Sequence, residues 1–302
     1  MRAGMMRFAL KLCAALLLVS PASAETVRFA TLNAWWLFDD QPPHASWGGQ
    51  RDDQSWEDAL AHVADAVARI DADVLALQEV EDRHAVERLN AVLASRGKGY
   101  PHYWVGAGDD PFTGQDVAVL SRFPNLTEPV RSYPAMQEDF HTNNGYPRVA
   151  ALHKFMRVDL EVEGEPVTVF ALHLKSKRGN RITSDGERLA QARMVRRLVR
   201  PVLEKGQPKI VVMGDFNDIP GSPALREIRG LNDASWDLSN AAESERMDGE
   251  AWTYQYRGNK EQIDHVLLSK FLFDKVASAS VVRIDSQASD HDAFAVDIAF
   301  SE

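Results

Sequence analysis

The 302-residue sequence holds only one cysteine, Cys13, and fewer basic than acidic side chains, with 34 Lys and Arg against 44 Asp and Glu. The net charge of −10 disfavours a protein that holds nucleic acid by bulk positive charge alone. It leaves room for an enzyme that contacts phosphate through a local basic patch and a metal. The sequence also lacks a Gly-x-Ser-x-Gly element, so the usual serine route to a covalent intermediate is absent. It contains no internal repeat and no low-complexity segment.

The first 24 residues have the pattern of a secretory signal peptide. Residues 1–11 carry three basic side chains and no acid, residues 12–19 are apolar, and Ala22-Ser23-Ala24 supplies the small residues of a cleavage site. The apolar run is too short to span a bilayer, which disfavours an uncleaved anchor. We therefore predict that residues 1–24 are removed and that the protein is exported, to the periplasm or out of the cell.

Cleavage after residue 24 changes the composition of the mature protein, residues 25–302. It removes Cys13 and three of the 34 basic residues, so 31 basic side chains face 44 acidic ones and the net charge becomes −13. The exported chain then has no disulfide, no thiol nucleophile and no cysteine-bound zinc. A domain of this length can be stable by core packing alone.

Hydrophobic periodicity in the mature chain alternates between strand and helix patterns. Strand patterns cover residues 26–32, 74–77, 117–120, 149–160, 167–174, 210–213, 263–268, 280–284 and 294–300. Helical spacing covers residues 55–70, 86–93 and 187–199, the last behind a Ser184-x-x-Glu187 capping pattern. Pro201 should kink or end that helix. Strands outnumber helices and no linker divides the chain, so we predict an α/β or α+β fold of layered sheets in one domain, residues 25–302.

Oxygen-bearing side chains gather where the predicted strands end. They are Asn33, Glu79, Asp215, Asn217, Asp218, Asp290 and Asp292. Each alone is typical of a turn former or a solvated side chain. Together they offer the hard donors that suit Mg²⁺, Mn²⁺ or Ca²⁺, and gathered carboxylates repel one another unless a cation neutralises them. Such a cation attracts phosphate, and His173 and His291 add groups that move protons or donate to an oxyanion.

Seven motifs, in this order, resemble the endonuclease/exonuclease/phosphatase superfamily, whose members have a DNase-I-like fold. They are Thr31-Leu32-Asn33, Leu77-Gln78-Glu79, Val119-Leu120-Ser121-Arg122, His173-Leu174-Lys175-Ser176-Lys177, Gly214-Asp215-Phe216-Asn217, Ile263-Asp264-His265 and Ser289-Asp290-His291. They extend over nearly the whole mature chain, and Gly-Asp-Phe-Asn and Ser-Asp-His are the most specific. The His-Leu-Lys-Ser-Lys segment, with Arg188 and Gln191-Ala192, is most similar to the secreted bacterial nuclease branch.

The resemblance implies a four-layered sandwich, in which two mixed sheets pack face to face with helices outside. It also implies hydrolysis of phosphate esters with a divalent cation, usually Mg²⁺. By motif, Asn33 and Glu79 would hold the metal, with Asp290 nearby. Asp215 would position or deprotonate the attacking water, and Asn217 would bind the scissile phosphate. A metal ion stabilises the charge that spreads over the nonbridging oxygens in the transition state.

Two acid–imidazole pairs follow from the same resemblance. Asp264 would orient His291, which stabilises charge or moves a proton. His173 would contact the phosphate from the other side, with Asp116 as its orienting partner. Since a neighbouring carboxylate raises the pKa of an imidazole, both histidines are expected to be charged.

Basic side chains concentrate immediately after the His173 motif. Nine Lys and Arg against two acids lie between residues 175 and 200. The arginines within the predicted helix are best explained as a solvated face. The other basic residues are predicted to bind phosphates that flank the cleaved one, which a polymer has and a small phosphomonoester lacks. They are Lys175, Lys177, Arg178 and Arg181 after the strand, and Arg148 in an earlier segment. This favours a nuclease that acts on DNA or RNA.

Two alternatives remain open at this point. Sphingomyelinases and inositol-phosphate phosphatases share the family core, although the sequence shows no long apolar loop of the membrane-binding kind. A non-catalytic exported binding protein on the same scaffold predicts losses among the ligand positions, and none is lost. The sequence implies a nucleic acid or other phosphodiester as substrate, no stable protein partner, and no membrane span once the signal peptide is removed.

Overall fold

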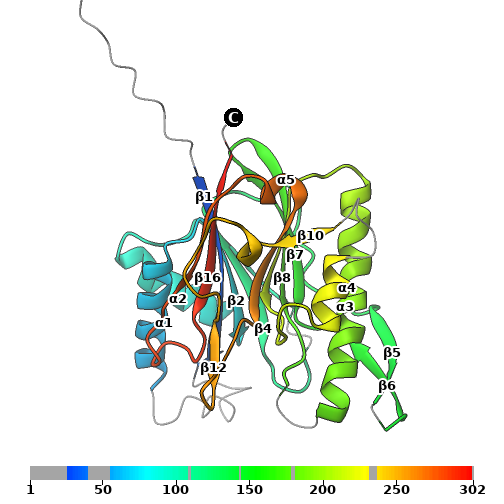
Figure 1. The fold of residues 1–302 in the computed structure, drawn as a ribbon. Coiled ribbons are helices and arrows are strands. Elements are labelled where there is room, and N and C mark those ends of the chain that lie inside the picture. Colours follow the sequence, from blue (N-terminus) through cyan, green and yellow to red (C-terminus); the bar gives the residue numbers. More distant parts are fainter. Residues whose placement is uncertain are drawn as a thin grey trace, which may run out of the picture.

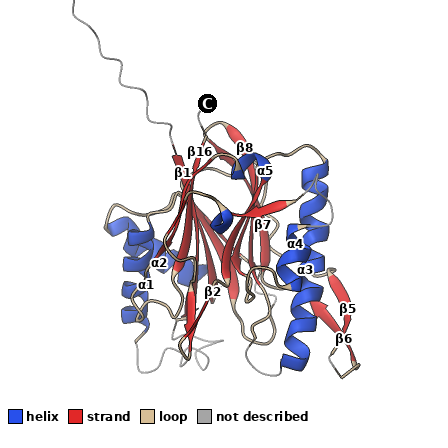
Figure 2. Cartoon of the chain, viewed as in Figure 1, coloured by secondary structure: helices blue, strands red, loops and turns tan. Residues whose placement is uncertain are grey.

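The computed structural model describes residues 26–39, 55–107, 110–142, 144–177, 181–230 and 237–300. Within these ranges two β-sheets lie face to face, and helices cover the outer face of each (Figure 1 and Figure 2). The predicted signal peptide lies outside the described residues. No helix in the described ranges combines the length and the apolarity needed to cross a bilayer.

The larger sheet has seven strands in the order β11-β15-β16-β1-β2-β4-β3. These strands are Met247–Asp248, Val276–Val282, Ala293–Ala299, Thr26–Leu37, Val74–Val80, Asp116–Ser121 and His102–Val105. The chain's first strand β1 and last strand β16 are antiparallel neighbours. Helices α1 (Trp56–Ile70) and α2 (Arg83–Ser95) pack on the outer face of this sheet.

The smaller sheet has five strands in the order β10-β14-β9-β8-β7. They are Leu238–Asn240, Asp264–Ser269, Ile210–Asp215, Glu165–His173 and Phe155–Val162. Helices α3 (Arg181–Glu204) and α4 (Pro223–Arg229) cover its outer face. The other described elements are the hairpin of β5 (Gln137–His141) and β6 (Pro147–Ala151), the hairpin of β12 (Tyr254–Tyr256) and β13 (Asn259–Glu261), the 3₁₀ turn Ala241–Glu243, and α5 (Lys270–Phe273).

Alternation along the strands explains the four layers. In β1, Val27 and Phe29 point into the core between the sheets, whereas Ala30 and Leu32 pack against the helices on the outer face. A strand whose side chains are buried on both faces belongs at the centre of a layered fold. Both sheets mix parallel and antiparallel pairs. The predicted four-layered sandwich is confirmed.

The strand predicted over residues 149–160 is not continuous. It is two strands, β6 and β7, which belong to different sheets and are separated by residues 152–154. The apolar pattern continues across the break because Leu152 is buried as well, in the cluster beneath α3. Periodicity alone therefore does not reveal the change of sheet.

The helix predicted over residues 187–199 is longer than expected. It begins at Arg181 and contains Pro201. Its apolar face stays buried beyond the proline, at Val202 and Leu203, so packing against the sheet outweighs the loss of one helical hydrogen bond. Ser184, the expected cap, lies inside the helix, and its hydroxyl has no hydrogen-bond partner among the described residues.

Strand pairing brings the predicted site residues to one end of the sandwich. β1 is parallel to β2, and β8 is parallel to β9, so Asn33, Glu79, His173 and Asp215 lie at or near carboxyl ends of strands. In the register of the smaller sheet, Asp215 stands between His173 on β8 and Asp264 at the start of β14.

Gly214 on β9 is required by a close approach to β8. Its φ is 152°, and a Cβ added there would lie 2.0 Å from the backbone oxygen of Leu172. We expect Gly214→Ala to lower the free energy of unfolding by at least about 3 kcal/mol, because paired strands cannot move apart to relieve the overlap. Urea unfolding measures the loss.

Gly164→Ala is the matched control for this substitution. Gly164 has a φ of 75°, and no described atom lies within 4 Å of an added Cβ. Its cost is the left-handed backbone alone, about 1–2 kcal/mol. Equal losses in the two variants would contradict the close approach as the reason for Gly214.

Candidate active site

Shifts in the pairing register of the neighbouring strands β1 and β2 occur where Asn33 and Glu79 lie close to each other. The β1–β2 register shifts between Asn33 and Leu37, and the β2–β4 register shifts between Gln78 and Val80. Bulges of this kind redirect a side chain out of the ladder. Glu79 has a φ of 58°, a conformation that persists in such a residue only where the surroundings impose it.

The amide of Asn33 joins carboxylates from both sheets. Its Nδ2 donates to Glu79 Oε1 and to Asp215 Oδ2, each at 3.1 Å. The amide oxygen accepts from the backbone N–H of Trp35 at 2.9 Å, and the N–H of Trp36 donates to Glu79 Oε2 at 3.2 Å. The end of β1 therefore fixes the orientation of both acids.

Asp215 is buried and is held by the turn that follows it. The backbone N–H of Asn217 donates to Asp215 Oδ1 at 2.7 Å, and Asn217 Nδ2 lies 3.1 Å from both Asp215 Oδ2 and the carbonyl oxygen of Leu174. Burial and the neighbouring Asp264 carboxylate raise the pKa of Asp215 to about 7. This carboxyl group can therefore exchange a proton near neutral pH.

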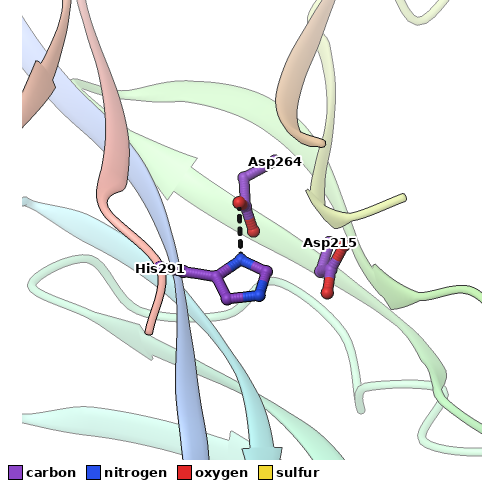
Figure 3. Close-up of side chains that lie close together, drawn as sticks. All are labelled: Asp215, Asp264 and His291. Atoms are coloured by element: carbon purple, nitrogen blue, oxygen red, sulfur yellow. Dashed lines mark hydrogen bonds and ion pairs between the residues drawn. The ribbon is translucent and has the colours of Figure 1, made fainter. Parts of the chain in front are cut away.

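Asp264 and His291 form a hydrogen-bonded pair beside Asp215 (Figure 3). Nδ1 of His291 lies 2.8 Å from Asp264 Oδ2. Burial favours the neutral imidazole, but the charge and hydrogen bond of Asp264 outweigh it, so the pKa of His291 lies well above its usual value. The second ring nitrogen, Nε2, is 3.9 Å from Asp290 Oδ1. The pair thus presents a positive charge next to the titratable Asp215.

Ser289 attaches this pair to the first strand. Its Oγ donates to the backbone oxygen of Asn33 at 2.7 Å and accepts from the N–H of His291 at 2.9 Å. The Ser-Asp-His motif is thereby held against the end of β1, from which it is separated by 256 positions in the sequence.

His173 differs from His291 in its charge. Its Nε2 is 3.6 Å from Asp215 Oδ2 and 3.9 Å from Glu79 Oε1, beyond hydrogen-bond range. Burial first, and then the positive charges of Lys154 and His291, lower the pKa of His173 well below its usual value. The expectation that both histidines are charged is therefore wrong for His173, which is neutral.

The prediction that Asp116 orients His173 is also wrong. The buried Nδ1 of His173 has no hydrogen-bond partner in the part of the chain that the structure describes. Asp116 begins β4, and its carboxylate lies against Gly106, where an added Cβ would be 1.9 Å from Oδ1.

These groups surround a cleft of ≈1530 Å³. The predicted site residues that line it are Glu79, Arg148, His173, Lys175, Lys177, Asp215, Asn217, Asp290 and His291. Asn33 and Asp264 are hydrogen-bonded to lining residues. Arg178 lies outside the described residues, and Arg181 is described only as the first residue of α3.

Lys154, which sequence reasoning misses, lines the same cleft. Its Nζ is 2.9 Å from Gln115 Oε1 and 3.3 Å from Asp110 Oδ2. Its backbone oxygen accepts from the N–H of His173 at 3.0 Å. Lys154 lies in the break between β6 and β7, which periodicity reads as one strand, so no local pattern distinguishes it.

Arg188 is not part of a solvated helix face. Only 1% of it is exposed. Its guanidinium donates to Asp218 Oδ2 at 3.0 Å, to the backbone oxygen of Lys175 at 2.9 Å, and to Asp185. Arg188 therefore joins α3 to the loops that follow β8 and β9, on which site residues stand.

The carboxylate side of the cleft fits a divalent cation. Burial raises the pKa of Glu79, although the amide of Asn33 and the positive charges of Lys154 and His291 act against it, and a bound cation would favour the ionised carboxylate. Glu79 and Asp290 offer the carboxylate oxygens that Mg²⁺ prefers. Asn33 has an amide oxygen as well, which here accepts from the N–H of Trp35 while Nδ2 faces Glu79. The residues present are therefore suited to hold such an ion.

A second group of side chains also has ligand spacing. One atom each of Asp215, Asp264 and His291 lies within 4.8 Å of the others. Nδ1 of His291 is already bonded to Asp264, however, and the protonated ring repels a cation. The oxygen donors on the Glu79 side carry no such opposing charge of their own.

The model of the Endonuclease/Exonuclease/phosphatase family matches residues 30–291. The chain belongs to this family. The family's members hydrolyse phosphoester bonds, and every site residue described above lies within the matched range. The resemblance carried by the seven motifs is confirmed. A comparison with curated protein sequences finds no match.

Solved structures share this family fold at low sequence identity. A double mutant of beta toxin from Staphylococcus aureus, with bound magnesium ions, is 17% identical, with a TM-score of 0.59 over 90% of this chain and 99% of that one. Sphingomyelinase C from Streptomyces griseocarneus is 18% identical, with a TM-score of 0.59 over 91% and 99%. Truncated TDP2 from Caenorhabditis elegans is 19% identical, with a TM-score of 0.60 over 90% and 97%.

Removing the charge of Asp264 tests the assignment of the imidazolium. We expect Asp264→Asn to lower the pKa of His291, because burial then acts without the compensating carboxylate. In the wild type the raised folded pKa stabilises the fold fully below the unfolded value of about 6.5, and this contribution is lost as the pH rises through the folded pKa. NMR titration of the metal-free protein measures the pKa, with His291→Ala to identify the signal. An unchanged pKa in Asp264→Asn would contradict the pairing.

Proposed function

We propose that the chain is an exported, divalent-metal-dependent phosphodiesterase that cleaves nucleic acid by water attack. The observation that carries this proposal is the juxtaposition of a charged imidazole, His291, with a titratable carboxyl group, Asp215, in one cleft. Phosphodiester hydrolysis needs a group that takes a proton from water and positive groups that stabilise the nonbridging oxygens. Export rests on the signal-peptide pattern at the N-terminus.

The protonation states assign the roles. Asp215, with a pKa of about 7, accepts a proton from the attacking water or holds that water in line with the scissile bond. His291, kept charged by Asp264, donates to a phosphate oxygen or protonates the leaving oxygen. Asn217 orients Asp215 and contacts the phosphate. Neutral His173 contacts the phosphate from the other side without adding charge.

Asn33 and Glu79, with Asp290, would hold the cation. When bound, Mg²⁺ would supply Lewis-acid stabilisation of the charged phosphate oxygens. The residues themselves keep the donor atoms in place, because Asn33 and the backbone of Trp36 fix both oxygens of Glu79.

The walls of the cleft support a polymeric substrate. Arg148 and Lys175 line the cleft and are exposed, and Lys177 lines it while paired with Asp218 at 3.3 Å and Glu261 at 3.8 Å. Cations beside a phosphodiester site bind flanking phosphates, which only a polymer provides. This favours a nuclease over an enzyme of small phosphate esters.

One observation supports a lipid phosphodiester as a second candidate. Three exposed apolar side chains, Phe112, Val149 and Tyr256, line the cleft, although the sequence shows no long apolar loop. The fold is also that of a sphingomyelinase C. Hydrolysis of sphingomyelin vesicles, with DNA and RNA left intact, would select this candidate.

Metal dependence is the first test of the proposed function. We expect a chelator to abolish cleavage of plasmid DNA or RNA and Mg²⁺ or Mn²⁺ to restore it, because the donors are all oxygen. Full activity in excess chelator would exclude a catalytic metal.

Glu79→Gln tests the metal ligand. Mutating a residue that only hydrogen-bonds to a metal ligand lowers metal affinity or activity by about 10- to 100-fold. Loss of the charge of a ligand itself should therefore lower kcat/KM by more than about 100-fold. Thermal unfolding should show the fold intact, because the substitution preserves volume. Glu161→Gln, an exposed position on β7, is the control and should match the wild type. An active Glu79→Gln enzyme would remove Glu79 from the ligand set.

Salt dependence tests the polymer contacts. We expect the double variant Arg148→Ala/Lys177→Ala to raise KM for an oligonucleotide and to reduce the slope of log KM against log salt by about 0.7 to 0.9 for each lost phosphate contact. A small phosphodiester without flanking phosphates should show a much smaller change. Arg246→Ala, exposed and outside the cleft, is the control. Equal effects on both substrates would argue against flanking-phosphate binding.

A further inference from the structure

Phe112 is the most exposed large apolar side chain in the described ranges, at 81%, and it lines the cleft that holds the site. Leaving a phenyl ring in water forfeits the gain from burying it. Because the Phe112 ring lines the cleft, a bound substrate can contact it.

The turn that carries Phe112 is anchored in place. Asp110 Oδ1 accepts from the N–H of Phe112 at 3.1 Å, and Asp110 Oδ2 accepts from the hydroxyl of Thr113. Lys154 pairs with Asp110 at 3.3 Å and donates to Gln115 at 2.9 Å. A ring positioned in advance loses less entropy when a ligand binds to it.

The same lysine connects this turn to the catalytic centre. The backbone oxygen of Lys154 accepts from the N–H of His173, and the side chain of Lys154 clamps the turn. Lys154 thus contacts both the turn that carries Phe112 and the backbone of His173, and both residues line the same cleft.

Two other exposed apolar side chains that line the cleft have a basic residue beside them. Arg148 is next to Val149, which is 60% exposed, and the guanidinium of Arg257 lies 5.1 Å from the centre of the Tyr256 ring. The exposed apolar side chains of the cleft come from three separate segments, and two of them, Val149 and Tyr256, have a basic residue next to them in the sequence. Rings interleaved with cations are the means by which proteins hold unpaired nucleic acid.

We propose that Phe112 is a stacking platform for an unpaired nucleobase near the cleaved phosphate, so that the enzyme prefers single strands to duplex. This inference rests on the proposed nuclease function. Inside a duplex both faces of a base are covered by its neighbours, so the ring can stack only on a base that is unpaired or flipped out.

The test compares three substrates: a single-stranded oligonucleotide, its duplex, and a strand of abasic nucleotides. The wild type should cleave the single strand faster than the duplex. Relative to the abasic strand, Phe112→Ala should lower kcat/KM for the base-bearing strand about tenfold, as expected for one lost stacking contact. Phe112→Trp should restore it. Phe271→Ala, 40% exposed on α5 and outside the cleft, is the control and should match the wild type.

Binding without turnover supplies an independent readout. With excess chelator, fluorescence anisotropy of a labelled single strand should show a Kd about tenfold weaker for Phe112→Ala and unchanged for Phe271→Ala. Thermal unfolding of each variant confirms that the fold is intact.

Three results would overturn the inference while leaving the nuclease function in place. They are equal kcat/KM for Phe112→Ala and wild type on the single strand, equal losses on base-bearing and abasic strands, and a loss seen only with sphingomyelin vesicles. A wild-type enzyme that cleaves no nucleic acid would refute the proposed function itself, and this inference with it.

Discussion

The site depends on the hydrogen bonds of the Asn33 amide, which connect an acid of one sheet to an acid of the other. Glu79 belongs to the larger sheet and Asp215 to the smaller one, and Asn33 Nδ2 donates to both. Without this donor the two acids would lose their shared partner, and among the described residues each would keep only local ones: the N–H of Trp36 for Glu79, and Asn217 for Asp215. The left-handed backbone at Glu79 occurs beside the hydrogen bonds from Asn33 and Trp36, and that at Asn217 beside its own hydrogen bonds to Asp215 and Leu174.

The two imidazoles show how one cleft produces opposite charge states. His291 has a carboxylate within hydrogen-bond distance, and His173 has two carboxylates that are both too far away. Burial lowers the pKa of both rings, so the difference arises from their neighbours: the hydrogen-bonded Asp264 raises the pKa of His291, whereas the nearby positive charges of Lys154 and His291 lower that of His173. Pairs of groups whose environments push their pKa values apart are typical of acid–base chemistry.

Much of the fold and the location of the site could be predicted from the sequence. Asn33, Glu79 and Asp215 each follow a short apolar run, and carboxyl ends of parallel strands meet at one edge. The layers followed from the same periodicity. The roles of these residues remain predictions, because the structure places them and does not measure what they do.

The features that the sequence did not predict depend on tertiary contacts, which leave no pattern in the local sequence. Lys154 lies in a break that periodicity conceals, and the environment of Phe112 depends on that lysine. Pro201 stays within a helix because Val202 and Leu203 after it are buried, and Arg188 is buried by its ion pairs and hydrogen bonds to the loops after β8 and β9. The neutral state of His173 required a distance, which no motif contains.

The contact of Ser289 with β1 bears on the order in which the site assembles. The pair of Asp264 and His291 stands in place only when the loop before β16 reaches Asn33, and β16 itself pairs with β1. These partners are 256 positions apart in the sequence. The acid–imidazole pair therefore reaches its position only after the two segments have come together, and most of the remaining strand contacts can form without it.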